Sequence, residues 1–184
     1  MQDKNSINIK DLSPQEIQDF VCDNNLQPFR ARQISKWLYK KGVASFDEMS
    51  DLSKEFRDLL EFSFSLEPSL QLVQEQVSED GTKKYLFKLS DGNQIESVLI
   101  PDKKRNTLCI SSQVGCALGC TFCMTGTLGK LRNLRPSEII DQYILVNEYN
   151  ENSITNIVFM GMGEPLDNLD NLVKVINVLT DPHY

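Results

Sequence analysis

The stretch Cys109-Ile-Ser-Ser-Gln-Val-Gly-Cys-Ala-Leu-Gly-Cys-Thr-Phe-Cys123 decides how the second half of the chain is interpreted. Three of its thiols, at Cys116, Cys120 and Cys123, lie within eight residues. Closely spaced cysteine thiolates hold iron–sulfur clusters, usually four to a cluster. Three thiolates would hold three irons of a [4Fe-4S] cluster and leave the fourth iron open to a ligand that is not protein. The spacing therefore predicts a catalytic cluster.

Zinc is the alternative partner for these thiols. Cys109 together with the three loop cysteines would make a four-thiolate structural site. Zinc ribbons usually pair two Cys-x-x-Cys knuckles, however, and this chain has one. Gly115 and Gly119 indicate a loop whose backbone bends around a bound group, which fits buried, unliganded cysteines less well. Cys22 stands alone in a predicted helix and is expected to be a small core residue.

The overall composition is that of a cytosolic enzyme. The chain has 184 residues, of which 40% are hydrophobic, enough for one domain or slightly more. It has no apolar run long enough to span a bilayer and no N-terminal signal-peptide pattern. Five cysteines in a leaderless chain indicate reduced thiols, so we expect a cytoplasmic protein without membrane contact. The net charge of -7 is unlike that of a typical nucleic-acid binder.

Residues 1–66 are expected to form a small helical accessory module. Ser13-Pro14-Gln15-Glu16 is a capping box with proline at the first helical position. A second helix is predicted from Phe29 to Lys41, where Gly42 is a stop signal, and a third helix after Ser53.

Residues 67–106 are expected to form an antiparallel β segment with a charged connector. Short β-prone runs are separated by Glu79-Asp-Gly and Asp91-Gly-Asn, which favour hairpin turns. The predicted strands are 70–73, 84–89 and 94–100, and the connector is 101–106.

Residues 107–184 are expected to form a truncated α/β core. Strand, helix, strand and helix follow one another with connection lengths typical of a parallel βα series. Two parallel strands can neither close a barrel nor cover both faces of a sheet, so we expect this core to be part of a longer one. The predicted elements are a strand from Thr107, a helix from Pro136, a strand over 154–160, the loop 161–165 and a helix over 169–179.

The cysteine loop also carries a family resemblance. Its pattern, Cys-x-x-x-Cys-x-aromatic-Cys with Phe122 as the aromatic residue, resembles that of the radical S-adenosylmethionine enzymes. With Arg132-Asn-Leu-Arg135 and Gly161-Met-Gly-Glu-Pro165, the stretch 109–123 is similar to the RlmN family, which methylates C2 of adenine in large-subunit ribosomal RNA and some transfer RNAs. The resemblance covers essentially the whole chain. It implies the first two βα units of a partial radical SAM barrel, preceded by the helical module and the antiparallel segment.

The resemblance assigns the cofactor ligands. A [4Fe-4S] cluster would be held by the three loop cysteines, and its open iron would chelate S-adenosylmethionine (SAM). Phe122 would pack beside SAM, and Gly163 and Glu164 would belong to the loop that binds it, with the carboxylate meeting its ammonium group. The alternative for Gly161-Met-Gly-Glu164 is an ordinary βα turn.

Glu96 and Cys109 are the residues that the resemblance places in catalysis. Glu96 matches the family's proton acceptor, and its alternative is a solvated strand position. Cys109 matches a cysteine that resolves the covalent RNA intermediate through a transient disulfide with a partner, and its alternative is a strand core thiol. Which of the two takes the C2 proton stays open.

The implied reaction also needs a methyl-carrier cysteine near the C-terminus of family members. No cysteine follows Cys123, so methyl transfer is not expected from this chain alone.

The resemblance implies partners as well. The substrates would be ribosomal RNA and tRNA, and a flavodoxin or ferredoxin would donate electrons to a monomeric enzyme. Basic residues of the helix 29–41, the connector and the segment after the cysteine loop could contact phosphate. Two other functions stay open, namely adenine-C8 methylation of ribosomal RNA and a non-catalytic, metal-stabilised RNA-binding fragment. Pro165 and the residues Val114 and Ala117 around the cysteines favour methylation at C2 over methylation at C8.

Overall fold

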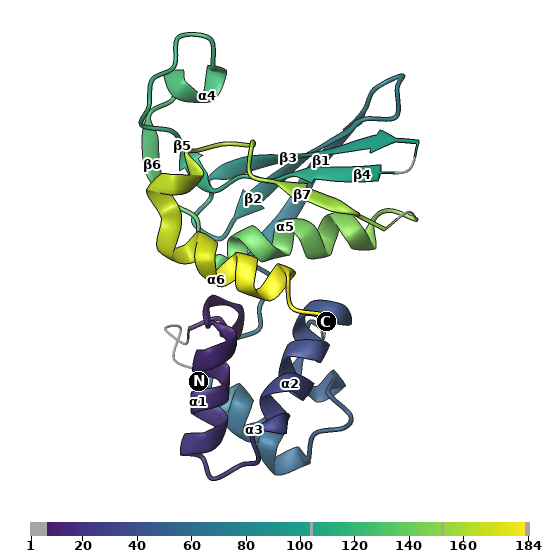
Figure 1. Cartoon of the computed structure of the whole chain (residues 1–184), viewed down its shortest axis with the longest axis vertical. Coiled ribbons are helices and arrows are strands. Elements are labelled where there is room, and N and C mark those ends of the chain that lie inside the picture. Colours follow the sequence, from purple (N-terminus) through teal and green to yellow (C-terminus); the bar gives the residue numbers. More distant parts are fainter. Residues whose placement is uncertain (1–6, 104, 152, 183–184) are drawn as a thin grey trace. The chain divides into compact units, whose positions relative to one another are not determined.

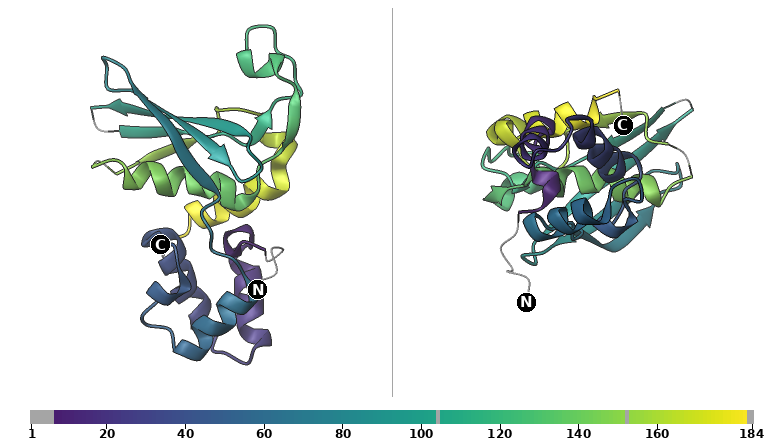
Figure 2. Two further views of the ribbon diagram at one scale, coloured as in Figure 1. Left: turned by 180° about the vertical axis from the view of Figure 1, so that it is seen from behind. Right: turned by 90° about the horizontal axis from the view of Figure 1, so that it is seen from below.

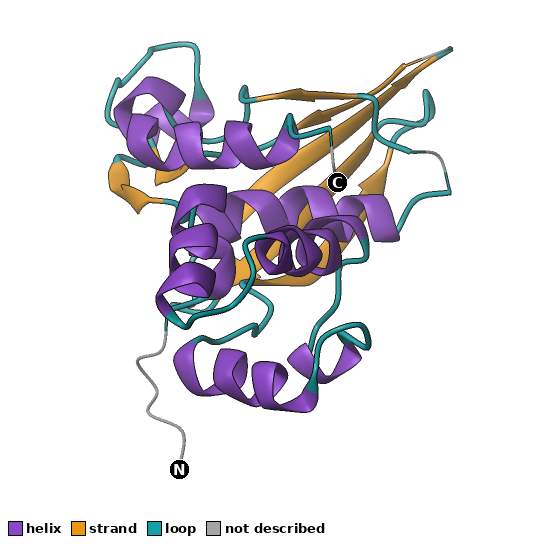
Figure 3. Ribbon diagram, turned by 60° about the horizontal axis from the view of Figure 1, so that its bottom comes forward, coloured by secondary structure: helices purple, strands orange, loops and turns teal. Residues whose placement is uncertain are grey.

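The computed structural model describes residues 7–103, 105–151 and 153–182 (Figure 1). The chain separates into two compact units, Met1–Pro68 with Val173–Tyr184, and Ser69–Leu172. All the described strands lie in the second unit, as the orange arrows of Figure 3 show. No described helix is long and apolar enough to cross a membrane.

The first unit is a helical module around its own apolar core. Its helices are α1 (Pro14–Asp23), α2 (Phe29–Ser35) and α3 (Lys54–Ser63), with α2 continuing as the π-helical turn η2 (Lys36–Lys40). It also contains two short 3-10 helices, η1 (Ile9–Asp11) and η3 (Phe46–Glu48). The residues most deeply buried in its core are Ile17, Val21, Ile34, Leu38, Met49 and Leu60.

The predicted start of the first helix is confirmed. Ser13 Oγ accepts from the Glu16 N–H at 3.2 Å, and Glu16 Oε2 accepts from the Ser13 N–H at 2.6 Å. The expectation that Cys22 is a core residue is wrong, because its side chain is exposed. It lies beside the buried stripe that Ile17 and Val21 form on α1.

One ion pair connects α1 to α6 (Leu169–Leu179), a helix that has its predicted bounds and whose residues from Val173 on belong to the first unit. Lys174 Nζ lies 2.8 Å from Glu16 Oε2. The Lys174 ammonium and the Ser13 N–H lower the pKa of Glu16 from 4.5 to about 2. Because the pKa is lower in the folded state, the carboxylate stabilises the fold above pH 4.5, and that contribution is lost as the pH falls towards 2.

The Glu16→Gln variant tests this pair. Nearly half of the Glu16 side chain is exposed, so screening keeps the pair to less than about 1 kcal/mol. We expect the thermal midpoint at pH 7 to fall by less than about 4 °C and the difference to vanish as the pH falls towards 2, followed by circular dichroism. Lys174→Met should produce the same loss, and the double variant no more. A difference independent of pH would contradict this account.

The second unit contains a five-stranded sheet of order β1-β2-β3-β4-β7. The first three pairings are antiparallel and β4 pairs with β7 in parallel, so the expected β segment and the expected βα series form one sheet. The strands are β1 (Leu70–Val77), β2 (Lys83–Leu89), β3 (Gln94–Asp102), β4 (Arg105–Cys109) and β7 (Asn156–Val158).

Helix α5 (Pro136–Glu148) covers one face of this sheet, as both Figures 1 and 2 show. Alternate residues of β2 and β3, such as Tyr85, Phe87 and Ile95, are fully buried, as are Ile139 and Val146 of α5. The intervening strand residues point to the opposite face and stay partly exposed. The uncovered face is thus the one open to a ligand or to further protein.

Between β4 and α5, three elements of the described chain were not predicted. A hairpin of β5 (Gln113–Gly115) and β6 (Lys130–Asn133) and the one-turn helix α4 (Met124–Thr127) lie between β4 and α5. Strand β7 is also shorter than the predicted 154–160, because the chain leaves the sheet after Val158 to form the loop 159–164 and the 3-10 helix η4 (Pro165–Asn168).

Candidate active site

The cysteine loop extends from the β5–β6 hairpin, just beyond the carboxyl end of β4 (Figure 1). Cys116 is buried at its base, where its N–H donates to Gly129 O at 3.1 Å. Cys120 and Cys123 are partly exposed further out, and the Cys123 N–H donates to Cys120 O at 3.0 Å. One loop therefore carries all three predicted ligand thiols.

Cys123 occupies the N-cap position of α4. The Gly126 N–H lowers the pKa of the Cys123 thiol, burial opposes this, and Thr125 lowers the pKa further. The thiolate is the form that binds metal, so this position suits a ligand.

The three thiols do not converge in this structure. The described residues contain no group of three or more His, Cys, Asp or Glu side chains close enough to hold a metal ion. Binding a cluster would require the loop to draw its sulfurs together. The chemistry of the donor set nevertheless fits a cluster, because three thiols share one short loop and one of them favours the thiolate.

Gly115 fixes the entry to this loop. Its φ of +77° is in the left-handed region, and a Cβ there would lie 1.8 Å from Gly129 O. Gly119 has a similar φ of +60° but nothing within 4 Å of its Cβ position. Backbone strain is thus shared by the two glycines, whereas the steric clash is confined to Gly115.

A pair of alanine variants separates these two effects. Gly119→Ala should lower the free energy of unfolding by about 1 kcal/mol, the cost of the left-handed backbone alone. Gly115→Ala should cost clearly more, because the β5–β6 hairpin must open to accept the methyl group. Urea denaturation of the two variants measures the difference, and equal losses would show that the close approach of Gly129 does not matter.

The loop Gly161–Glu164 packs against the segment that precedes the cysteines. A Cβ on Gly161 would lie 2.7 Å from Ile110 O, and one on Gly163, at φ +104°, would lie 2.6 Å from Gln113 Cβ. The Ser112 and Gln113 N–H groups both donate to Met162 O, at 2.9 and 3.1 Å. The Gly161–Glu164 loop is therefore joined to the segment that leads into the cysteine loop, through close contacts that only glycine allows and through hydrogen bonds to Met162 O.

Glu96 and Cys109 lie on the uncovered face of the sheet. Cys109 pairs with Val98 across β4 and β3, and Glu96 is two residues from Val98 on the same face. The Glu96 carboxylate forms an ion pair with Lys84 Nζ of β2 at 3.0 Å. Burial raises the pKa of the Cys109 thiol, opposed by the Met160 N–H.

Phe122 and Glu164 differ in how firmly they are held. The Phe122 ring is 91% exposed and packs against nothing that would fix it, whereas Glu164 Oε1 accepts from the Leu166 N–H at 3.1 Å and caps η4. As the protein stands, the Glu164 carboxylate is thus already engaged by backbone.

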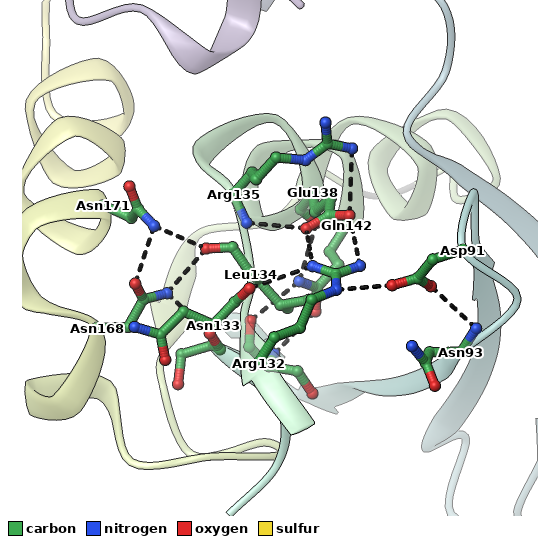
Figure 4. Close-up of polar contacts among 12 residues, drawn as sticks. Asp91, Asn93, Arg132, Asn133, Leu134, Arg135, Glu138, Gln142, Asn168 and Asn171 are labelled. Atoms are coloured by element: carbon green, nitrogen blue, oxygen red, sulfur yellow. Dashed lines mark hydrogen bonds and ion pairs between the residues drawn. The ribbon is translucent and has the colours of Figure 1, made fainter. Parts of the chain in front are cut away.

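The cluster that sequence reasoning missed is centred on Arg132 of β6 (Figure 4). Its guanidinium forms two hydrogen bonds with the fully buried Glu138 carboxylate, at 2.8 and 2.9 Å, and a third with Asp91 at 2.6 Å. The hydrogen bonds that Arg132 donates to Glu138 raise the pKa of the guanidinium above its usual range. Although burial raises the pKa of Asp91, its bonds with Arg132 and Asn93 bring it to about 2. Arg132 thereby connects the hairpin below the cysteine loop to α5 and the β2–β3 turn.

Replacing Arg132 by alanine tests how much the hairpin depends on this cluster. The variant leaves the buried Glu138 carboxylate with only its longer, 3.3 Å ion pair to Arg135, so it should lose about 3 kcal/mol of unfolding free energy in urea denaturation. Arg105→Ala is the matched control, since its pair with Asp102 is largely exposed and worth less than about 1 kcal/mol. Similar losses in both variants would contradict a structural role for the buried cluster.

Comparison with known proteins relates both units to known families. The family model described as the ribosomal RNA large subunit methyltransferase N-terminal domain matches residues 7–65, and the radical SAM superfamily model matches residues 110–182. The "Dual-specificity RNA methyltransferase RlmN" of Geotalea uraniireducens is 50% identical over 176 residues, which are 96% of this chain and 50% of that protein. Its counterpart in Geobacter sulfurreducens is 50% identical over 173 residues, covering 94% and 47%.

A solved structure supports the same relation. The radical SAM methyltransferase from Sphaerobacter thermophilus superposes with a TM-score of 0.80 at 35% identity, over 96% of this chain and 53% of that one. The expected α/β class and partial radical SAM fold are thereby confirmed. The chain spans about half the length of the curated relatives it matches.

Proposed function

The chain is a homologue of the N-terminal half of the RlmN methyltransferases, and we propose that it is the radical-generating half of an RNA adenine-C2 methyltransferase. The observation that carries the proposal is the pairing of two loops at the ends of the parallel strands. The cysteine loop lies beyond β4 and the Gly161–Glu164 loop follows β7. Met162 O of the second loop accepts from the N–H groups of Ser112 and Gln113, which lead into the cysteine loop. Ligands of βα folds bind at this end of the strands.

The radical SAM relation implies a [4Fe-4S] cluster and SAM as cofactors. When bound, they supply a 5′-deoxyadenosyl radical. In our assignment Cys116, Cys120 and Cys123 hold the cluster. Phe122, Gly163 and Glu164 contact SAM, the glycine by allowing close approach of the backbone.

Glu96 and Cys109 are proposed to act on the substrate carbon. Burial disfavours the Cys109 thiolate, so Glu96, held by Lys84, is the better acceptor for the C2 proton. Cys109 would then form the transient disulfide that releases product. Since no cysteine follows Cys123, its partner in that disulfide would be a cysteine outside these residues.

We place the RNA contact on the helical unit rather than beside the cysteine loop. Lys130 pairs with Asp167 at 2.6 Å, and Arg132 is occupied by carboxylates. By contrast, α2 and η2 carry exposed cations, which suit phosphate. These cations are Arg32, Lys36 and Lys40, and they are followed by Lys41, whose ammonium lies over the Trp37 ring. Ribosomal RNA and tRNA as substrates, a flavodoxin or ferredoxin as electron donor, a cytoplasmic location and a monomeric state are parts of this proposal.

Anaerobic reconstitution with iron and sulfide tests the assignment of the cluster. The chain should take up about four iron and four sulfide and gain broad visible absorbance. Serine at position 116, 120 or 123 should each abolish most of this uptake, whereas Cys22→Ser, a cysteine of the helical unit, should leave it intact. Bound zinc with neither iron nor sulfide would overturn the proposal in favour of a metal-stabilised RNA-binding module.

The site of methylation is tested in a whole-length protein that contains this sequence. Mass analysis of the modified adenine should identify methylation at C2. Methylation at C8 instead would make this sequence part of the related ribosomal RNA methyltransferase.

A further inference from the structure

We propose that Gln113 is a positioning residue that fixes the Gly161–Glu164 loop against the base of the cysteine loop and so sets the affinity for SAM. Its side chain is fully buried, three residues before Cys116. The inference rests on the proposed function, because it takes Gly163 and Glu164 as part of the SAM-binding loop.

Both the oxygen and the nitrogen of the Gln113 side-chain amide form hydrogen bonds. Oε1 accepts from the Glu164 N–H at 2.9 Å. Nε2 donates to Asn133 Oδ1 at 2.8 Å and to Asp167 Oδ2 at 3.0 Å. One side chain thus connects the loop after β7, the strand that closes the cysteine hairpin, and η4.

The neighbourhood requires both a donor and an acceptor at this position. The Glu164 N–H needs an acceptor, while Asp167 needs donors and also binds Lys130 through the same oxygen. The Lys130 ammonium and then the Gln113 amide lower the pKa of Asp167, so a carboxylate faces Gln113. Glutamate at 113 would keep the acceptor but oppose that carboxylate, and leucine would lose both interactions.

The bond to Glu164 has consequences for the loop. Glu164 is held through its N–H by Gln113 and through its carboxylate by the Leu166 N–H. Gly163, immediately before it, touches the Gln113 side chain so closely that it has no room for a Cβ. Removing the amide at 113 therefore frees the backbone of the residues proposed to contact SAM, while the cysteines keep their own hairpin.

The test compares Gln113→Leu with the double variant Gln113→Glu/Asp167→Asn. The double variant keeps the net charge, the acceptor for the Glu164 N–H and a donor facing position 113. In Gln113→Leu we expect hydrogen exchange at the Glu164 amide of the cofactor-free chain to be roughly tenfold faster, the worth of one hydrogen bond. Exchange at the Cys116 amide, whose acceptor is Gly129 O within the β5–β6 hairpin, should stay unchanged and serves as the internal control.

SAM affinity of the reconstituted protein is the second readout. It should fall roughly tenfold in Gln113→Leu at unchanged iron and sulfide content and recover to about twofold of wild type in the double variant. If Gln113→Leu does not fold, Gln113→Glu takes its place. The proposal then requires that Asp167→Asn restore the SAM affinity that Gln113→Glu loses. Unchanged exchange at Glu164, unchanged affinity, or a loss of iron in proportion to SAM would each overturn the proposal. A wild-type protein that binds no SAM would contradict the proposed function, and the exchange measurement would still decide the role of Gln113.

Discussion

The candidate site depends on a buried stretch of backbone, Ser111 to Gln113, that has already left the sheet. Buried N–H and C=O groups need hydrogen-bond partners, and neighbouring strands do not supply all the partners that these three residues need. Gln142 of α5 binds both the N–H and the C=O of Ser111, at 2.8 and 3.0 Å. Met162 O accepts from the next two residues, and Asn168 donates to Ser112 O at 2.9 Å. Satisfying this stretch fixes α5, the Gly161–Glu164 loop and η4 around the cysteine hairpin.

Short sequence patterns predicted the helices whose formation depends on residues close together in the sequence. The capping box at Ser13, the helix from Pro136 and the helix over 169–179 follow from helix-start signals and apolar spacing. The β5–β6 hairpin did not, because strands of three and four residues carry no readable alternation. The exposure of Cys22 was missed since one helical step separates it from the buried stripe.

The polar scaffold of the site was beyond sequence reasoning for a different reason. The two cofactor loops could be proposed from their own residues, but Gln113 meets its partners across 20 to 54 positions of sequence. The same holds for Arg132, which could be assigned to RNA from its charge and is instead bound to Glu138 and Asp91. The sequence shows that a residue is basic or carries an amide, but only the fold shows which residue it binds.

The central claim is that the two loops form one site, with SAM on the open iron of a cluster whose other three irons the cysteines hold. Electron paramagnetic resonance of the reduced, reconstituted protein, recorded before and after addition of SAM, tests it most directly. The account predicts that SAM changes the spectrum of the cluster, because it becomes a ligand of the iron that no cysteine holds. A cluster spectrum that stays the same at saturating SAM would contradict it.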